Sequence, residues 1–311
     1  QWTATPLALH GVVVKKGGEM LEICIGEDPA DPVFCVSDLL PHLAAEQNKR
    51  TLAEGIKGEE LNVIVGSLPF ADDEKLKEPV KLMALKLLYE KYGITEKDFI
   101  RAEIEMVPAV KARDVGFDRS MVGAYGQDDR VCAYTALMAE LEAEKPEYTT
   151  VTVFADKEET GSEGNTGLSS DFLLQEGADY KQVLAASVCL SSDVNAAFDP
   201  TFPQVSEERN SSYLNRGCVL TKYTGARGKS STNDASAELM ARVIDLFEEN
   251  GVCWQTGELG AVDVGGGGTV AKMNVDTVDL GVPVLSMHSP FELTAKLDVY
   301  HTYKAYKAFL Q

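Results

Sequence analysis

The stretch TVTVFADKEETGSEG, residues 150–164, is an apolar run followed by charged residues and a glycine turn. The run from Thr150 to Ala155 is typical of a buried strand. After Pro108, runs of this kind alternate with segments that have helical spacing of apolar residues. This alternation predicts an α/β fold in which helices sandwich a mainly parallel sheet.

Two adjacent glutamates, Glu158 and Glu159, follow that strand directly. A strand that ends in paired carboxylates presents one of them to a bound cation and leaves the other free to accept a proton from water. The pair therefore indicates a metallohydrolase. The alternative interpretation is a solvated acidic turn, because Asp156 and Glu163 lie in the same segment.

The remaining elements after Pro108 follow from the same patterns. Helices are expected at 130–145, 169–176, 231–250 and 295–310, and further strands at 183–190 and 280–287. The part before Pro108 has short apolar runs at 11–14, 22–25 and 62–65, and a helix at 80–92 that Gly93 ends. We therefore expect a β-rich α+β domain at 1–106 and a second domain at 107–311.

Composition excludes several classes of partner. The chain has 311 residues, 44% of them hydrophobic, and 29 basic against 49 acidic residues give a net charge of −20. This balance argues against nucleic acid and anionic membranes as partners. The six cysteines show no paired spacing, and no signal peptide or long apolar span is present. We expect reduced, mostly buried thiols and a cytoplasmic protein.

Polar residues stand at the ends of four of the predicted elements. Asp128 precedes a helix, Glu159 and Asp193 follow strands, and His288 follows the last strand. The carboxyl ends of strands meet in α/β sheets, so these side chains are expected to converge, although isolated acidic residues at strand ends are also common. Carboxylates and an imidazole suit zinc, manganese or cobalt. Two ions would share a bridging carboxylate, and Glu158 would be the general base.

Four strings carry a resemblance to a known family: GQDDR at 126–130, DKEETGSEG at 156–164, SSDVNAAFDP at 191–200 and MHSPFELTAKLDVY at 287–300. They resemble the signatures of the aspartyl aminopeptidase / aminopeptidase I family of dinuclear zinc metallopeptidases, closest to its bacterial aminopeptidase I branch. The resemblance implies zinc-dependent removal of N-terminal residues from peptides, with two Zn²⁺ per subunit and Co²⁺ or Mn²⁺ as alternatives. It also implies a homododecamer, and a dimerisation domain inserted at 1–106.

The resemblance assigns a role to each residue. Asp128 corresponds to the bridging aspartate and Glu158 to the general base. Glu159 and His288 correspond to the ligands of one ion, and Asp193 to a ligand of the other.

One ligand of the family pattern has no counterpart. The family's first metal-binding histidine lies in a His-x-Asp motif, and none of the four histidines here (His10, His42, His288 and His301) stands in that context. Because the other ligands are intact and the chain begins at Gln1, we expect that the N-terminal part of the catalytic domain is absent from this sequence. A natural pseudoenzyme is the alternative.

Two further residues are candidates for substrate binding. His42 is expected to reach the active site of a neighbouring subunit, as a dimerisation-domain histidine does in relatives, or else to form local hydrogen bonds. Lys222 stands where the family places a basic residue near the substrate, or else is an exposed strand lysine. The glycines at 265–268 lack the lysine of a phosphate-binding loop and indicate close backbone approach to the substrate or metals.

Two other functions stay open at this stage. One is a non-catalytic assembly subunit with a peptidase fold, and the other is a related dinuclear metal deacylase. Retention of Glu158 and of the four ligands argues against the first, and the MHSPFE string argues against the second. The strings DVGFDRSMVGAYGQDDR at 114–130 and TKYTGARGKSSTNDA at 221–235 resemble the bacterial aminopeptidase I branch, and this resemblance implies a broad preference for neutral N-terminal residues.

Overall fold

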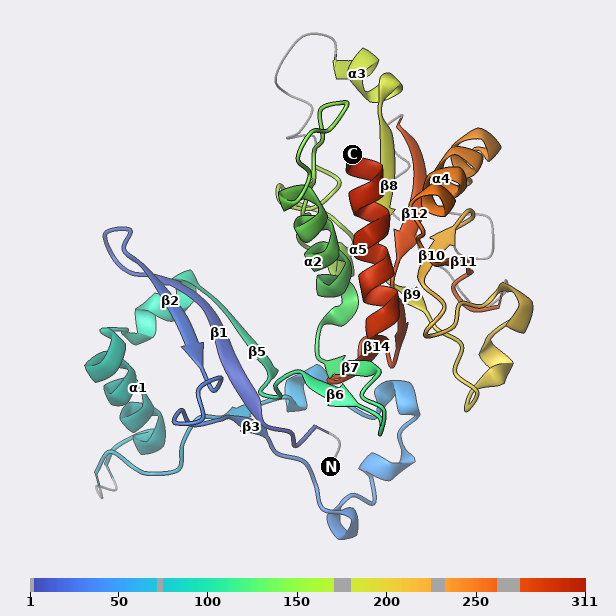
Figure 1. The fold of residues 1–311 in the computed structure, drawn as a ribbon. Helices are drawn as coiled ribbons and strands as arrows, with labels where there is room; N and C mark the ends of the chain where they lie inside the picture. The colour runs from blue at the N-terminus through green and yellow to red at the C-terminus, as the bar shows by residue number, and fades with distance from the viewer. Residues whose placement is uncertain (1–2, 72–74, 171–179, 225–232, 262–274) are drawn as a thin grey trace. The chain divides into compact units, whose positions relative to one another are not determined.

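The structure is a computed structural model that describes residues 3–71, 75–170, 180–224, 233–261 and 275–311. The chain folds as two compact units, Gln1–Lys111 and Ala112–Gln311. In Figure 1 the first unit runs from blue to green and the second from green to red. The division lies a few residues after Pro108, where the sequence pattern changes.

The first unit is built around a three-stranded antiparallel sheet of order β2-β1-β5. Its core consists of Val13, Ile23, Ile25 and Ile94, which are all buried. The elements of this unit are β1 Leu7–Val14, β2 Met20–Ile25, β3 Cys35–Val36, β4 Val63–Ile64, α1 Pro79–Tyr92 and β5 Ala102–Pro108.

Helix α1 matches the helix expected at 80–92. It ends at Gly93, whose φ of 67° lies in the left-handed region and whose N–H donates to the carbonyl of Tyr89. Glycine adopts this conformation without steric cost, so the sequence signal for the helix end is local and correct.

The second unit holds a four-stranded sheet of order β11-β10-β12-β8 and a five-stranded sheet of order β6-β7-β14-β13-β9. Its strands are β6 Arg113–Val115, β7 Met121–Ala124, β8 Val188–Ser192, β9 Asn195–Ala196, β10 Cys218–Thr221, β11 Trp254–Thr256, β12 Asp276–Gly281, β13 Pro283–Leu285 and β14 Glu292–Ala295. The α/β class is as expected. The pairing is mixed: β8–β12, β10–β11 and β9–β13 are parallel, whereas the other named pairs are antiparallel. Short connections such as the one between β13 and β14 allow antiparallel neighbours.

The helices of the second unit are α2 Gln127–Leu141, α3 Tyr180–Ala186, α4 Ala237–Glu249 and α5 Lys296–Leu310. Helices α2 and α5 lie side by side, and α4 also contacts α5 (Figure 1). In α4 the buried residues Leu239, Met240, Val243 and Phe247 form one apolar face, which packs in the core with β10 and β12. Ser236 caps α4 by accepting a hydrogen bond from the N–H of Leu239.

Two sequence expectations need correction. Residues 150–155 form no strand, and Val151, Val153 and Phe154 are exposed. The apolar run at 183–190 divides into the end of α3, which has no buried residue, and the start of β8. An apolar run of this length does not by itself distinguish a helix turn from a strand. Most of the helix expected at 169–176, and the glycines at 265–268, lie outside the described residues.

Gly281, at the end of β12, allows a close passage of the chain that follows β8. A Cβ atom at this position would lie 1.6 Å from the carbonyl oxygen of Asp193. No side chain fits there unless the backbone around Asp193 moves.

We therefore predict that Gly281→Ala lowers the free energy of unfolding by about 1–3 kcal/mol, the usual cost of overpacking. The matched control is Gly66→Ala, because a Cβ at Gly66 meets no atom within 4 Å. Chemical denaturation of both variants measures the difference. Equal effects of the two substitutions would contradict the proposed close passage.

Candidate functional site

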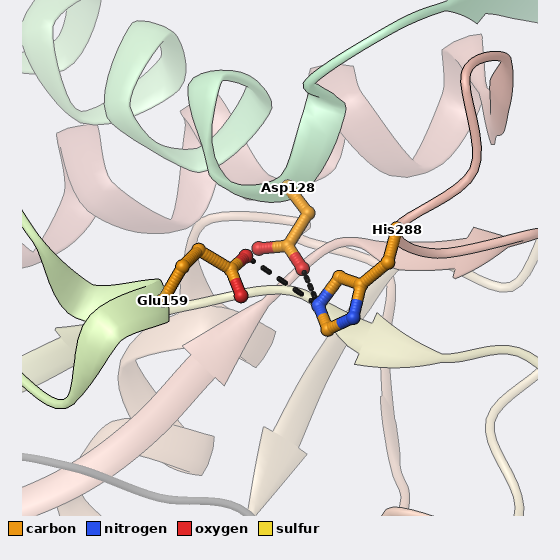
Figure 2. A group of neighbouring side chains, drawn as sticks. All are labelled: Asp128, Glu159 and His288. Carbon is orange, nitrogen blue, oxygen red and sulfur yellow. Dashed lines mark ion pairs between the residues drawn. The ribbon is translucent and has the colours of Figure 1, made fainter. Parts of the chain in front are cut away.

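Three of the residues expected to bind metal form one cluster. The Nε2 atom of His288 lies 2.9 Å from Oδ2 of Asp128 and 3.4 Å from Oε1 of Glu159. Figure 2 shows the three side chains pointing toward one another from α2, from the short turn at Glu158–Thr160 and from the loop between β13 and β14. One ligand atom from each lies within 4.8 Å of the others.

Asp128 also belongs to a second cluster. Its carboxylate and those of Asp129 and Asp193 offer ligand atoms that all lie within 4.8 Å of one another. Asp193 follows β8, and its Oδ1 atom accepts a hydrogen bond from the N–H of Val194. The two clusters thus overlap at Asp128, so all four residues expected from the sequence to bind metal meet around one buried carboxylate.

Three carboxylates of this site, those of Asp128, Asp129 and Asp193, carry raised pKa values. Burial raises the pKa of Asp128 to about 6, with a further contribution from the charge of Glu159, while His288 opposes the shift. Burial raises the pKa of Asp193 to about 7 and that of Asp129 to about 8, and neighbouring carboxylates add to both. Several negative charges crowded away from water are unfavourable until a cation neutralises them.

The donor set fits a divalent cation. Oδ1 of Asp129 is buried and has no hydrogen-bond partner, which is a costly arrangement for a carboxylate oxygen. Oxygen donors with one imidazole match the ligands that zinc takes in catalytic sites. Within the described residues, the cluster of Asp128, Asp129 and Asp193 contains no histidine.

Glu292 fixes the geometry of the first cluster. This fully buried carboxylate accepts hydrogen bonds from the N–H of His288 at 2.7 Å and from the N–H of Asp128 at 3.1 Å. His288 has a φ of 63°, a left-handed conformation that is strained for a residue with a side chain. One buried side chain thus holds two ligand-bearing backbones in place, one of them strained.

Glu158 lies beside the clusters without joining either of them. It lines a cavity of about 480 Å³ together with Asp128, Asp129 and Asp193. Partial burial and the charge of Glu159 raise the pKa of Glu158. A carboxylate at the wall of a cavity next to a metal cluster is placed to exchange protons with a molecule in that cavity.

Two further residues are predicted from the sequence to bind substrate, Lys222 and His42. Lys222 follows β10 and forms an ion pair with Asp234, and it does not line the cavity beside the carboxylates. His42 is exposed and lies in the first unit, within a short turn at Pro41–Leu43.

Sequence reasoning missed Asp129 and Glu292. The metal-binding role was assigned to Asp128 alone, although the two successive aspartates before a helix could have indicated Asp129 as well. Glu292 lies four residues after His288 inside the MHSPFE string. Its carboxylate accepts hydrogen bonds from backbone N–H groups, and such bonds cannot be predicted from a pattern of residue types.

No helix in the described part of the chain combines the length and the apolar character needed to span a membrane.

We predict that Glu292→Gln weakens metal binding. The amide keeps the shape of the side chain but turns one acceptor oxygen into a donor that faces a backbone N–H, so Asp128 or His288 loses its support. Zinc affinity of the chain should fall by about tenfold or more, as for other changes just outside a ligand shell. Isothermal titration measures it, with Glu248→Gln on the exposed face of α4 as the control. Unchanged affinity in Glu292→Gln would refute the positioning role.

Comparison with known proteins agrees with this site. Residues 1–310 match the family described as aminopeptidase I zinc metalloprotease (M18). The chain is 50% identical to the probable M18 family aminopeptidase 1 of Clostridium acetobutylicum, over 100% of this chain and 70% of that protein. For the corresponding Thermotoga maritima protein the identity is 48%, over 100% of this chain and 71% of that protein.

Solved structures agree as well. The crystal structure of the M18 aminopeptidase from Thermotoga maritima superposes with a TM-score of 0.93 at 48% identity, covering 100% of this chain and 72% of that one. Aminopeptidase I from Clostridium acetobutylicum superposes with the same score at 49% identity, covering 100% of this chain and 70% of that one. The acidic cluster around Asp128 is therefore found on the fold of a zinc peptidase, and the chain belongs to the aminopeptidase I zinc metalloprotease family, M18.

Proposed function

We propose that the two overlapping clusters are the metal site of this zinc aminopeptidase and hold two ions per chain. The observation that carries the proposal is the sharing of Asp128 between the clusters, because a bridging carboxylate is what two neighbouring divalent ions require. Glu159 and His288 would hold one ion, and Asp193 the other, with Asp129 beside it. Co²⁺ and Mn²⁺ suit the same donors.

Two of the remaining histidines, His301 and His10, are engaged in other contacts, so neither supplies a further ligand to the ion held by Asp193. His301 is buried, and its Nδ1 accepts a hydrogen bond from the N–H of Cys253, so it is engaged elsewhere. His10 pairs with Glu27 at 3.1 Å in the first unit. We infer that the second ion needs a further ligand of the kind found in the family's His-x-Asp motif, which this sequence lacks.

In this proposal each side chain of the site has a separate role in peptide hydrolysis. When bound by Asp128, Glu159, Asp193 and His288, zinc would polarise a peptide carbonyl and lower the pKa of a water molecule. The Glu158 carboxylate would accept a proton from the water that attacks the peptide carbonyl and return it to the leaving amine. Glu292 keeps Asp128 and His288 in position by its hydrogen bonds to their backbone N–H groups. Asp128 is only 8% exposed, whereas Glu159 and His288 are 57% and 63% exposed, which leaves one side of the site open to a substrate.

The proposed roles of the adjacent glutamates can be separated. Glu158→Gln keeps size and hydrogen-bonding outline but removes the base, so turnover of an aminoacyl substrate should drop by roughly 10²–10⁴ at near-normal metal content. Glu159→Gln removes a negatively charged ligand, so metal content should fall together with activity. Metal analysis and cleavage rates of both variants decide the matter. Loss of metal in Glu158→Gln alone would reverse the roles, and full activity in both would exclude this site.

The same assay separates the competing functions. A non-catalytic assembly subunit would not cleave aminoacyl substrates, and a deacylase would prefer N-acylated ones. We propose a broad preference for neutral N-terminal residues, which a panel of neutral, acidic and basic aminoacyl substrates tests.

Lys222, proposed to lie near the substrate, should change KM more than kcat when replaced by Met. We place the enzyme in the cytoplasm, which accords with the six free thiols.

We also propose that the first unit mediates self-association, up to a dodecamer as in the family that the sequence resembles. A solved structure of similar fold, the Saccharomyces cerevisiae mApe1 dodecamer, is only 22% identical, so that likeness shows the fold alone. The support from this chain is a set of exposed apolar side chains in the first unit: Leu39, Leu40, Leu43, Leu52, Ile56, Leu61, Ile64, Val65, Leu68 and Phe70. Exposed apolar residues this dense along one segment are typical of protein interfaces. His42 lies within this segment and would reach a neighbouring subunit.

Replacement of Leu43 and Leu52, which are 68% and 99% exposed, by Glu should weaken self-association without unfolding the unit. Light scattering should show an oligomer for the wild-type chain and a smaller species for the double variant. The control is Met20→Glu, a 70% exposed residue of β2 outside this segment. A monomeric wild-type protein would contradict the proposal.

A further inference from the structure

The three-stranded sheet of the first unit has one face on its core and one face turned away from it. In β2 the buried residues Ile23 and Ile25 alternate with the exposed residues Glu22 and Cys24. Successive side chains of a strand point to opposite faces of the sheet. Because Ile23 and Ile25 belong to the core of this unit, Glu22 and Cys24 lie on its outer face.

His10 of β1 brings together three kinds of metal ligand on this outer face. It is directly opposite Cys24 of β2 on one side and Glu105 of β5 on the other, and β1 is the middle strand (Figure 1). Directly opposed residues of an antiparallel pair share a face, with Cβ atoms about 4.5–5.5 Å apart. An exposed thiol, an imidazole and an exposed carboxylate therefore form one row across the sheet.

Glu27, which follows β2, adds a second carboxylate to the row. The Nε2 atom of His10 lies 3.1 Å from Oε1 of Glu27 and 3.7 Å from Sγ of Cys24. These two contacts compete for one nitrogen, because an Nε2–H that donates to the carboxylate cannot also accept a hydrogen from the thiol. A cation bound at Nε2 would satisfy the nitrogen, the sulfur and the oxygen together.

The spacing and the donor types suit zinc. Neighbouring ligands of a tetrahedral zinc ion, with bonds of about 2.0–2.3 Å, lie about 3.4–3.6 Å from one another. The two distances from Nε2 are close to this range. A thiolate with an imidazole favours zinc and related transition metals over magnesium and calcium, which prefer oxygen ligands.

The outer-face donors differ in one respect from the clusters at Asp128. Within the described residues, the donor atoms of His10, Cys24 and Glu27 do not all lie within 4.8 Å of one another. The side chain of Glu27 is 38% exposed, and Cys24 and Glu105 are exposed as well. Such side chains can turn toward an ion at Nε2 without disturbing the core of the unit.

We propose that His10, Cys24, Glu27 and Glu105 bind one divalent transition-metal ion, zinc by their chemistry, on the outer face of the first unit. Four protein ligands close a tetrahedral zinc site, so the ion is structural and does not activate water. It ties β1 to both of its neighbours in the sheet and holds the chain that follows β2. The site shares no residue with the clusters at Asp128 and does not rest on the function proposed for them.

Cobalt(II) is the probe for this site. A thiolate bound to Co²⁺ gives an intense near-ultraviolet charge-transfer band, whereas carboxylate and imidazole ligands do not. Within the described residues, the two clusters at Asp128 contain no cysteine, so Co²⁺ bound there gives no such band. The reduced 311-residue chain is titrated with Co²⁺, and the band should rise to saturation. A wild-type chain that binds Co²⁺ without this band would overturn the proposal.

Matched variants identify the ligands. Cys24→Ser should abolish the band, whereas Cys35→Ser, a change at a half-buried cysteine of β3 in the same unit, should leave it intact. His10→Gln and Glu105→Gln should weaken Co²⁺ binding, followed through the band, by about tenfold or more. Glu59→Gln, at an exposed glutamate of the first unit, is their control. A band that survives Cys24→Ser, or an affinity unchanged by His10→Gln, would refute the site.

The same readout separates this site from the catalytic one. In Glu159→Gln the band should persist, because that glutamate lies in the second unit. Loss of the band in Glu159→Gln would place the thiolate at the clusters and overturn the proposal. A chain that shows the band but has no peptidase activity would sustain the outer-face site and count against the proposed function. Peptidase activity without the band would do the reverse.

Discussion

The second unit is organised around the crowding of carboxylates at Asp128. Asp128 and Asp129 stand at the start of α2 and Asp193 follows β8. Burial, with a further contribution from neighbouring carboxylates, raises the pKa of each well above that of a solvated aspartate. Such an arrangement is unfavourable for a bare protein, because like charges in a poorly solvated site repel one another strongly. It becomes favourable when a divalent cation is shared among them. The start of α2, the end of β8 and the loop between β13 and β14 all lead to this point.

The helix limits and most of the metal-ligand candidates could be predicted from local signals in the sequence. The limits of α1 and α5 follow from helical spacing and from Gly93, since these signals act within a few residues. Asp128, Asp193 and His288 were found because each stands near the end of an element, where α/β folds gather their functional groups. Glu159 was found beside a strand that the structure does not form, through its pairing with Glu158. Neither inference needs knowledge of which strand pairs with which.

Strand pairing and contacts between distant parts of the chain could not be predicted, because they depend on residues outside the local sequence. The run at 150–155 has a strand's pattern, but pairing depends on a partner that the pattern does not name. The run at 183–190 has an apolar pattern that suits both helix and strand, and the fold uses it for both. Glu292 looks like an ordinary acidic residue in sequence. Its importance comes from two backbone N–H groups brought to it by folding, one of them 164 residues away.

The two sides of the site differ in how firmly they are held. Asp128 and His288 are tied to one buried side chain by bonds to their own backbones, so their positions are set by the packed core. Glu159 contacts the cluster through His288 at 3.4 Å, and its segment is anchored to α2 through the threonine bonds to Glu140. Segments with few buried contacts and unpaired backbone open at low energetic cost. The side of the site that carries both glutamates is therefore the less firmly held of the two, because its contacts run through side chains and not through a buried anchor like Glu292.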